Sequence, residues 1–382
     1  MPRKIYLHIG VEKTGTTSLQ HALAANRQVL REHGFLYPET AGSYSHRGLP
    51  LCTADASRTL DLQKSANLCD PTRFSEYRRE QPALIATEVE QSGCGTIIFS
   101  SEHCSSRLRT KDEISALHRM MAPLGSQCRI VIYLRRQDEL ALSAYSTGLK
   151  TGRRSKFSFP NNNKWLEYNR LLGLWGEVFG AENLVVRIFE RTSMVDGDLF
   201  FDFFSLIGFP AIDQIERPPD KNMRLDALTG EFLRRFNAHV PLYTDTGVNP
   251  LRGAIAPALE ALSTGPSLRP PAAAAREFLA GFAASNADVA RTYLERQDGV
   301  LFAEMPPDDE APEQPILDTK KAIEIAAALW CRQQERIIEL QQRIRQMERE
   351  KQSRARSGQQ QRTLASRAVA GAPARGGGLP VS

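Results

Sequence analysis

The sequence predicts an α/β fold, in which a central parallel sheet is flanked by helices. Short apolar runs occupy residues 4–9, 96–100, 129–134 and 183–188, and longer segments with helical spacing separate them. Apolar runs that alternate with helices are typical of parallel strands covered on both faces. The composition, 41% hydrophobic and 24% charged over 382 residues, is that of a globular protein with enough chain for a large core.

The segment after the first predicted strand begins with a loop over residues 11–17. Residues 18–33 then carry leucines at helical spacing and stop at Gly34, so they predict a helix with glycine at its C-terminal end. The next segment, residues 35–95, is polar and rich in turn-forming residues. It predicts one helix, at residues 74–91.

The chain beyond residue 100 is also mostly helical by its pattern. Three helices are predicted, at residues 111–121, 137–147 and 165–179. Residues 222–305 add further helices, and we therefore expect one α/β domain over residues 1–305. Residues 306–317 are rich in proline and acidic residues, which is typical of a linker.

A long helix with a heptad pattern is predicted over residues 318–351. One set of residues recurs every seven positions: Ile323, Trp330, Ile337 and Ile344. A second set recurs three residues after each of these: Ala326, Gln333, Leu340 and Met347. This is the spacing of a and d positions in a coiled coil with one polar d residue. Two interpretations stay open: self-association into a homo-oligomer, or a single helix packed back on the body.

The positive charge of the chain is concentrated near its C-terminal end. Eleven Lys or Arg residues and four Glu residues lie from Arg332 onward, so this segment has a charge of +7. The whole chain has a net charge of +5, and the residues before Arg332 therefore have a charge of −2. The charge is therefore no evidence that the body binds nucleic acid, and no specific nucleic-acid partner is predicted. Residues 352–382 predict a disordered basic tail. Its charge suits solvation, or peripheral contact with an anionic membrane surface or nucleic acid.

Several patterns bear on location and metals. The chain has no run of about eighteen apolar residues, and the apolar run near its beginning is shorter than that of a signal peptide. We therefore expect a cytoplasmic protein. The six cysteines lack C-x-x-C spacing and the seven histidines lack H-E-x-x-H spacing, so no metal site is predicted.

The strongest functional signal is the loop between the first strand and the first helix. Unpaired backbone N–H groups and the positive end of the helix dipole meet at a helix N-terminus, where they bind anions. The loop adds an ammonium, a glycine and hydroxyls: Lys13, Thr14, Gly15, Thr16, Thr17 and Ser18. The lysine precedes the glycine, so the loop is not a Walker A motif. Two interpretations are a phosphate or sulfate cradle, and a Gly-Thr-Thr run that caps the helix.

The segment Lys13-Thr14-Gly15-Thr16-Thr17, with the leucine that follows, resembles the 5′-phosphosulfate loop of sulfotransferases that use 3′-phosphoadenosine 5′-phosphosulfate (PAPS). A second region, residues 133–145, resembles the 3′-phosphate segment of that family, in which an Arg at a strand end is followed eight residues later by a Ser. Arg135 and Ser143 have this spacing. The resemblance implies a P-loop NTPase-like α/β fold, PAPS as co-substrate and no metal requirement.

Physical arguments support the second region independently. An Arg guanidinium binds phosphate through two parallel hydrogen bonds, and eight residues bring a helical side chain back to roughly the same face. Two anion sites on neighbouring strand ends suit a nucleotide with phosphates at both ends. The alternative makes Arg135 a surface ion-pair partner and Ser143 a helix-surface residue.

A weaker resemblance to bacterial carbohydrate-type members covers residues 1–305, through Tyr168, Trp175 and Asn183 among others. The late Arg-Lys-Gly loop of cytosolic members, which also holds the 3′-phosphate, is absent from this sequence. Candidates for that contact, without assigned roles, are Lys150, Arg153, Arg154 and Lys221.

Sulfuryl transfer to a hydroxyl needs stabilisation of the leaving oxygen and a base for the acceptor proton. Lys13 is placed for the first role. Glu102 and His103 follow the second predicted strand, where parallel sheets gather their sites, and both are candidate bases. The resemblance favours Glu102. His46 is expected to be a surface or structural histidine, and His8 a packed core histidine.

The sequence therefore predicts a sulfotransferase that moves a sulfuryl group from PAPS to a hydroxyl of a carbohydrate or lipid-linked glycan, by in-line transfer with a Glu or His base. Two alternatives remain. A nucleotide-dependent kinase would need Mg²⁺ and an aspartate that no strand end offers. A non-catalytic nucleotide-binding scaffold would bind the nucleotide without transfer.

Overall fold

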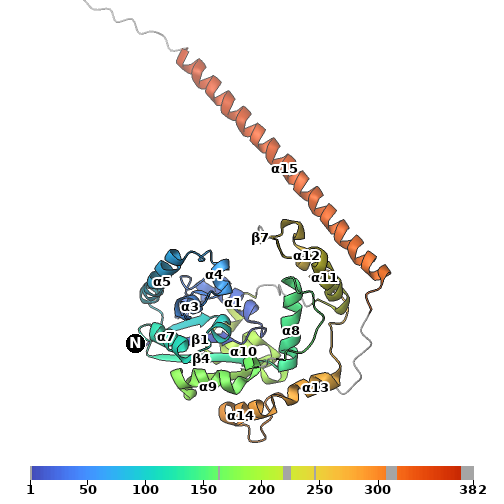
Figure 1. Ribbon diagram of the computed structural model, residues 1–382. Coiled ribbons are helices and arrows are strands. Elements are labelled where there is room, and N and C mark those ends of the chain that lie inside the picture. Colours follow the sequence, from blue (N-terminus) through green and yellow to red (C-terminus); the bar gives the residue numbers. More distant parts are fainter. Residues whose placement is uncertain (1, 162–163, 218–224, 245–246, 307–315, 371–382) are drawn as a thin grey trace, which may run out of the picture.

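The computed structural model describes residues 2–161, 164–217, 225–244, 247–306 and 316–370, with side chains up to residue 352. Within these ranges a parallel five-stranded sheet forms the centre, in the order β2-β3-β1-β4-β5 (Figure 1). Its strands are β1 (Lys4–Gly10), β2 (Phe35–Leu36), β3 (Thr96–Ser100), β4 (Gln127–Leu134) and β5 (Leu184–Ile188). A small antiparallel hairpin pairs β6 (Tyr243–Thr244) with β7 (Gly247–Val248). The predicted α/β fold is confirmed.

The four predicted strands are present as β1, β3, β4 and β5. The sequence analysis missed β2, which consists of two residues paired with the start of β3. A strand this short leaves no periodic pattern in the sequence.

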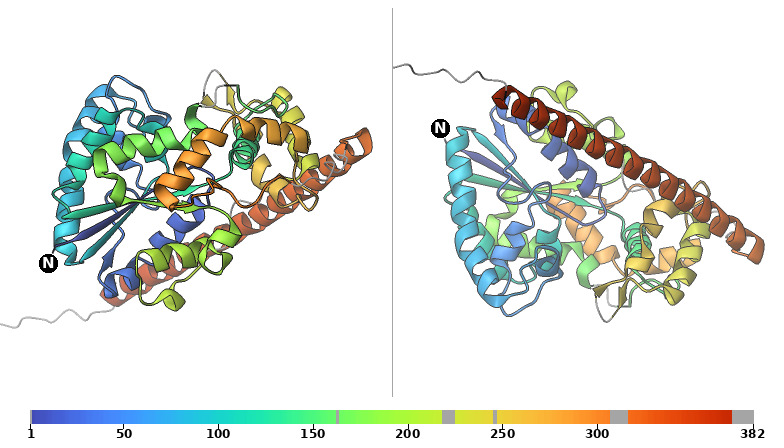
Figure 2. Two further views of the ribbon diagram at one scale, coloured as in Figure 1. Left: turned by 90° about the horizontal axis from the view of Figure 1, so that it is seen from below. Right: turned by 90° about the horizontal axis from the view of Figure 1, so that it is seen from above.

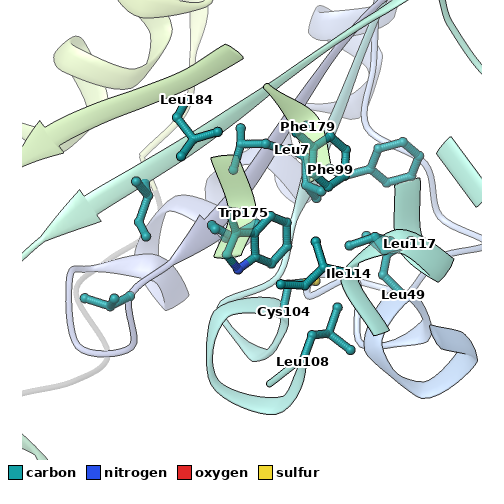
Figure 3. Packing of buried hydrophobic residues seen from close by; sticks show 14 of the residues in the cluster. Leu7, Leu49, Phe99, Cys104, Leu108, Ile114, Leu117, Trp175, Phe179 and Leu184 are labelled. Atoms are coloured by element: carbon teal, nitrogen blue, oxygen red, sulfur yellow. The ribbon is translucent and has the colours of Figure 1, made fainter. Parts of the chain in front are cut away.

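Side chains along β1 alternate between two helical layers, which lie on opposite faces of the sheet (Figure 2). Ile5, Leu7 and Ile9 belong to the larger layer, where Trp175 packs near Leu7 and Phe99 (Figure 3). The helices of this layer are α3 (Gly48–Thr53), α4 (Asp61–Ser65), α5 (Pro71–Ser92), α6 (His103–Arg107), α7 (Lys111–Met121), α9 (Tyr168–Phe179) and α14 (Ala283–Leu294).

The second layer covers the opposite face with α1 (Thr16–Ala25), α2 (Arg27–Glu32) and α10 (Leu199–Leu206). The prediction of one helix over residues 18–33 is wrong, because the helix is interrupted at Asn26. The Asn26 amide donates to the carbonyl oxygens of Ala22 and Glu216, and its oxygen accepts from the Glu216 backbone N–H. This distant contact fixes a helix boundary that local pattern does not contain.

A third cluster of buried side chains lies beside the sheet. It joins α8 (Gln137–Lys150), α11 (Ala227–His239) and α12 (Ile255–Glu260), and α13 (Ala272–Ala280) also packs on α8. Tyr145, Leu149 and Leu233 are at its centre. The predicted linker, residues 306–317, lies largely outside the described residues.

The C-terminal helix, α15 (Thr319–Ala370), runs out from the body (Figure 1). Its main contacts are with α11 and α12. The prediction of disorder from residue 352 is wrong as far as residue 370, because Arg, Gln and Ala are good helix formers and continue the helix. Residues 371–382 lie outside the described residues. Among the helices that the structure describes, none is both long and apolar enough to cross a bilayer.

Candidate functional site

The sheet topology itself marks a place for a ligand. The connection that leaves β1 leads to β2 on one side, whereas the connection that leaves the neighbouring strand β4 leads to β5 on the other side. Crevices form beyond the carboxyl ends of two neighbouring strands whose connections diverge, and open α/β sheets bind ligands there. The loop that carries Lys13 follows β1, and Arg135 follows β4. The two predicted anion-binding segments therefore flank this point.

The loop after β1 is held in an unusual backbone conformation. Lys13 has φ 68° and Gly15 has φ 72°, both in the left-handed region, and such a conformation costs a non-glycine residue about 1–3 kcal/mol. The buried Thr14 hydroxyl donates to the Val11 carbonyl oxygen at 2.7 Å and so closes the loop on itself.

The N-terminus of α1 keeps its backbone donors available. Among the described residues, no side chain caps this end of the helix, where Gly15 is the N-cap residue. The interpretation of the Gly-Thr-Thr run as a side-chain cap therefore finds no support in the geometry. Thr16 is buried, whereas Thr17 and Ser18 are half-buried on the first turn of the helix.

Positive charge gathers around the loop. Burial lowers the pKa of Lys13, and the nearby cations Lys150 and Arg135 lower it further, while Glu12 and Glu102 act in the opposite direction. Desolvation is the largest of these effects, and a bound anion would favour the charged form of Lys13. A desolvated cation at a crevice in the sheet is a feature of functional sites.

Arg135 lies directly against the loop. Its guanidinium donates to the Lys13 carbonyl oxygen at 2.7 Å and to Glu139 at 2.8 and 3.1 Å, and it stacks over the Phe189 ring. Its backbone oxygen accepts from the buried Tyr168 hydroxyl. Arg135 is buried, so it is not the exposed ion-pair partner of the alternative interpretation. A phosphate at this position would compete with Glu139 for the guanidinium.

Ser143 lies on α8, where it is half-buried. It is about 9 Å along the helix axis from Gln137, the first residue of α8, at 1.5 Å per residue. It lines a cavity of about 340 Å³ between α8 and α11, together with Tyr145 and Lys156. The structure thus brings Lys13 and Arg135 together and places Ser143 on the wall of a separate cavity, which neither of them lines.

Glu102 lies against the end of β1. A Cβ on Gly10, whose φ is 88°, would approach the Glu102 Cβ to 2.9 Å, so only glycine allows this contact. The Gln20 amide on α1 donates to the Glu102 carboxylate at 2.6 Å and to the Ser100 hydroxyl at 3.3 Å. The sequence analysis missed Gln20, because its link to Glu102 follows from the pairing of β1 with β3.

His103, the other candidate base, begins α6 and lies near a different acid. Its Nδ1 is 4.0 Å from a Glu12 carboxylate oxygen, which Arg107 also binds at 2.6 Å. Burial lowers the pKa of His103, and the nearby Glu102 partly offsets this effect. The imidazole is therefore mainly neutral at pH 7 and able to accept a proton. Arg107 also binds Asp61 and ties α6 to the loop, a role that the sequence did not indicate.

His8 and His46 are both fully buried. His8 Nδ1 and the Ser100 hydroxyl are hydrogen-bonded at 2.8 Å, and the His8 ring packs edge-on against Tyr133 and Phe203. His46 accepts from the Ser100 backbone N–H and donates to the Pro38 carbonyl oxygen. The prediction that His8 is a core histidine is confirmed, and His46 is structural rather than part of the site.

The remaining candidates have partners elsewhere. Lys150 pairs with Glu260, and the Arg153 guanidinium stacks on Tyr145 at 4.9 Å. The Arg154 carbonyl oxygen accepts from Arg234. Lys221 lies outside the described residues. No group of three or more His, Cys, Asp and Glu side chains that could hold a metal ion occurs in the described part of the chain.

A second cavity, of about 580 Å³, opens beside the loop. Val11 and Glu12 form one wall and Arg107 on α6 another. The segment that leads into α9 contributes Trp165, and α9 itself contributes Arg170. The Trp165 side chain is 51% exposed, which offers an apolar surface beside positive charge. This cavity borders both the loop that carries Lys13 and the helix that begins with His103.

Comparison with known proteins gives weak similarities. No family model matches the chain. An uncharacterized protein of Archaeoglobus fulgidus is 30% identical over 115 residues, which are 30% of this chain and 32% of that protein, so the match spans about a third of the relative's length. The crystal structure of a sulfotransferase from Alicyclobacillus acidocaldarius aligns with 77% of this chain and 97% of its own, at 15% identity and a TM-score of 0.36. Similarity at this level assigns no function.

Proposed function

We propose that the protein is a sulfotransferase that takes a sulfuryl group from PAPS to a hydroxyl of a carbohydrate or lipid-linked glycan. One observation carries the proposal most directly: an uncapped helix N-terminus, with Lys13 on its loop, stands at the divergence point of the sheet beside Arg135. These groups suit the two anionic ends of one nucleotide.

The residues present fit such a nucleotide in part. Lys13 and the backbone donors of Gly15, Thr16 and Thr17 would hold the phosphosulfate end, and Arg135 would hold the 3′-phosphate. PAPS supplies the sulfuryl group and a leaving phosphate. Lys13 would stabilise negative charge at the leaving oxygen, and positioning would supply much of the rate.

The acceptor would enter from the cavity beside the loop, which Glu12 and Arg107 line. Glu102 would accept the proton from its hydroxyl. The Gln20 amide occupies one oxygen of the Glu102 carboxylate and thereby orients the other. His103, held neutral by burial, is the alternative base.

The experiment compares thermal unfolding with adenosine 3′,5′-bisphosphate (PAP) and with ATP–Mg²⁺, because a ligand that binds only the folded state raises Tm. We expect stabilisation by PAP and loss of it in Lys13→Ala. The matched control is Lys111→Ala, which removes an exposed lysine paired with Glu177. With radiolabelled PAPS and a glycan panel, Glu102→Gln should bind PAP yet transfer poorly.

Each other result has a distinct meaning. Stabilisation by ATP–Mg²⁺ instead of PAP would favour a kinase. PAP binding with no transfer to any acceptor would favour a non-catalytic binding protein. Full transfer activity in Lys13→Ala would contradict the proposed mechanism.

A further inference from the structure

The C-terminal helix leaves an apolar stripe uncovered. Six of the heptad side chains are large and apolar, and all six are between 36% and 66% exposed: Ile323, Trp330, Ile337, Leu340, Ile344 and Met347. Together with Ala326 and Gln333 they recur every three or four residues, and so form one continuous face of α15. A soluble helix of this length gains little from propensity alone and is stabilised by burying such a face.

The body of the protein covers another side of the helix. Ile325 and Leu329 pack half-buried on the α11–α12 cluster, and Arg332 donates to the Ala258 carbonyl oxygen. Ile323 and Trp330, which lie within two residues of these contacts in sequence, stay 62% and 66% exposed. The heptad stripe therefore does not pack on the body, and it is accessible to a partner.

The spacing of the stripe identifies the partner's geometry. A repeat of seven residues gives 3.5 residues per turn, which keeps one seam facing a second, similar helix over several turns. A helix that packs on a globular surface does not need a strict seven-residue repeat. We propose that two copies of this chain associate through α15 as a parallel, in-register, two-stranded coiled coil.

The polar layer favours the parallel arrangement. In register, Gln333 of each copy faces Gln333 of the other, and two side-chain amides can donate to and accept from each other. In an antiparallel pair centred on the same stripe, Gln333 faces Ile337 and its amide is buried without a partner, which is costly. Charge agrees, because Arg343 at a g position then faces Glu348 at the e position of the other copy.

Sedimentation equilibrium of the full chain tests the association. We expect twice the chain mass of 42.6 kDa at micromolar concentration. Leu340→Asp should reduce the mass to that of one chain, because it places two carboxylates in one buried layer. Ile338→Asp is the matched control, since Ile338 is a neighbour in sequence, 53% exposed and outside the stripe.

A single-chain mass for the unchanged protein, a mass of three or more chains, or equal dissociation by Ile338→Asp would overturn the proposal. Far-UV circular dichroism shows whether each variant keeps its helices.

Disulfide trapping tests the orientation. Leu340→Cys, with the exposed Cys69 and Cys331 changed to serine, should cross-link to itself under oxidation, because the two d positions face each other in register. Trp330→Cys on a chain of different tag length should form no mixed cross-link with it. Mixed cross-links between positions 330 and 340 would show antiparallel helices and overturn the proposed register.

Discussion

At the scale of single residues, the site is built from side chains and backbone that are unfavourable on their own. Lys13 combines a left-handed backbone with a partly buried ammonium near two other cations. Residues held in such states persist only where the surrounding structure determines them, and they gather at functional sites. The proposed nucleotide would offset part of the desolvation cost of the Lys13 ammonium.

The two buried histidines make stability depend on pH. Burial lowers the pKa of His8 and of His46 to about 3, whereas the unfolded chain has histidines near 6.5. As pH falls below 6.5, these histidines become protonated in the unfolded state but stay neutral in the folded state. The free energy of unfolding should fall by about 2 kcal/mol per histidine between pH 7 and pH 5, as measured by urea unfolding.

Variants separate this effect from that of other titrating groups. His46→Asn should lower the stability at pH 7 but lessen its decline toward pH 5, whereas exposed His239→Asn should leave the decline unchanged. An undiminished decline in His46→Asn would show that His46 takes up its proton in the folded state as well.

At the scale of elements, local signals were readable and distant contacts were not. Strands β1, β3, β4 and β5 and the loop with Lys13 could be predicted, because their patterns lie within a few residues. The break at Asn26 depends on Glu216, and the bond from Gln20 to Glu102 depends on strand pairing. No spacing in the sequence encodes these contacts. Likewise, the place of Ser143 in the cavity between α8 and α11 depends on how these helices pack and not on residue spacing.

The start of α1 gives a test of how tightly the loop is packed. A Cβ on Gly15 would come within 2.7 Å of a Leu199 methyl group on α10, and φ is +72°. Gly15→Ala should therefore lower the free energy of unfolding by about 1–3 kcal/mol and weaken PAP binding. Because Leu199→Ala removes the contact, the double variant should cost less than the sum of the single changes.

The matched control is Gly173→Ala in α9, where an added Cβ meets nothing within 4 Å. It should be neutral or stabilising by up to about 1 kcal/mol. Strict additivity of Gly15→Ala and Leu199→Ala would mean that α1 and α10 shift apart without strain.

At the scale of the whole molecule, α11 connects the outer helix to the site. It packs on α8, which begins just after Arg135, and also on α15. A chain that stops at residue 318 loses Ile325 and Leu329 from this cluster, while one that stops at residue 336 keeps them. The free energy of unfolding of the shorter chain should be about 1–3 kcal/mol lower than that of the longer one. Its Tm in calorimetry should be lower by about 2–4 °C per kcal/mol. Equal Tm values would show that α15 contributes nothing to the body.

The length of α15 also governs how the protein moves through water. Its 52 residues span roughly 78 Å at 1.5 Å per residue, so a thin rod projects from a rounder mass and drags on the solvent far more than its weight suggests. On a gel-filtration column calibrated with compact standards, even a lone chain would emerge early, at the volume of a much heavier particle.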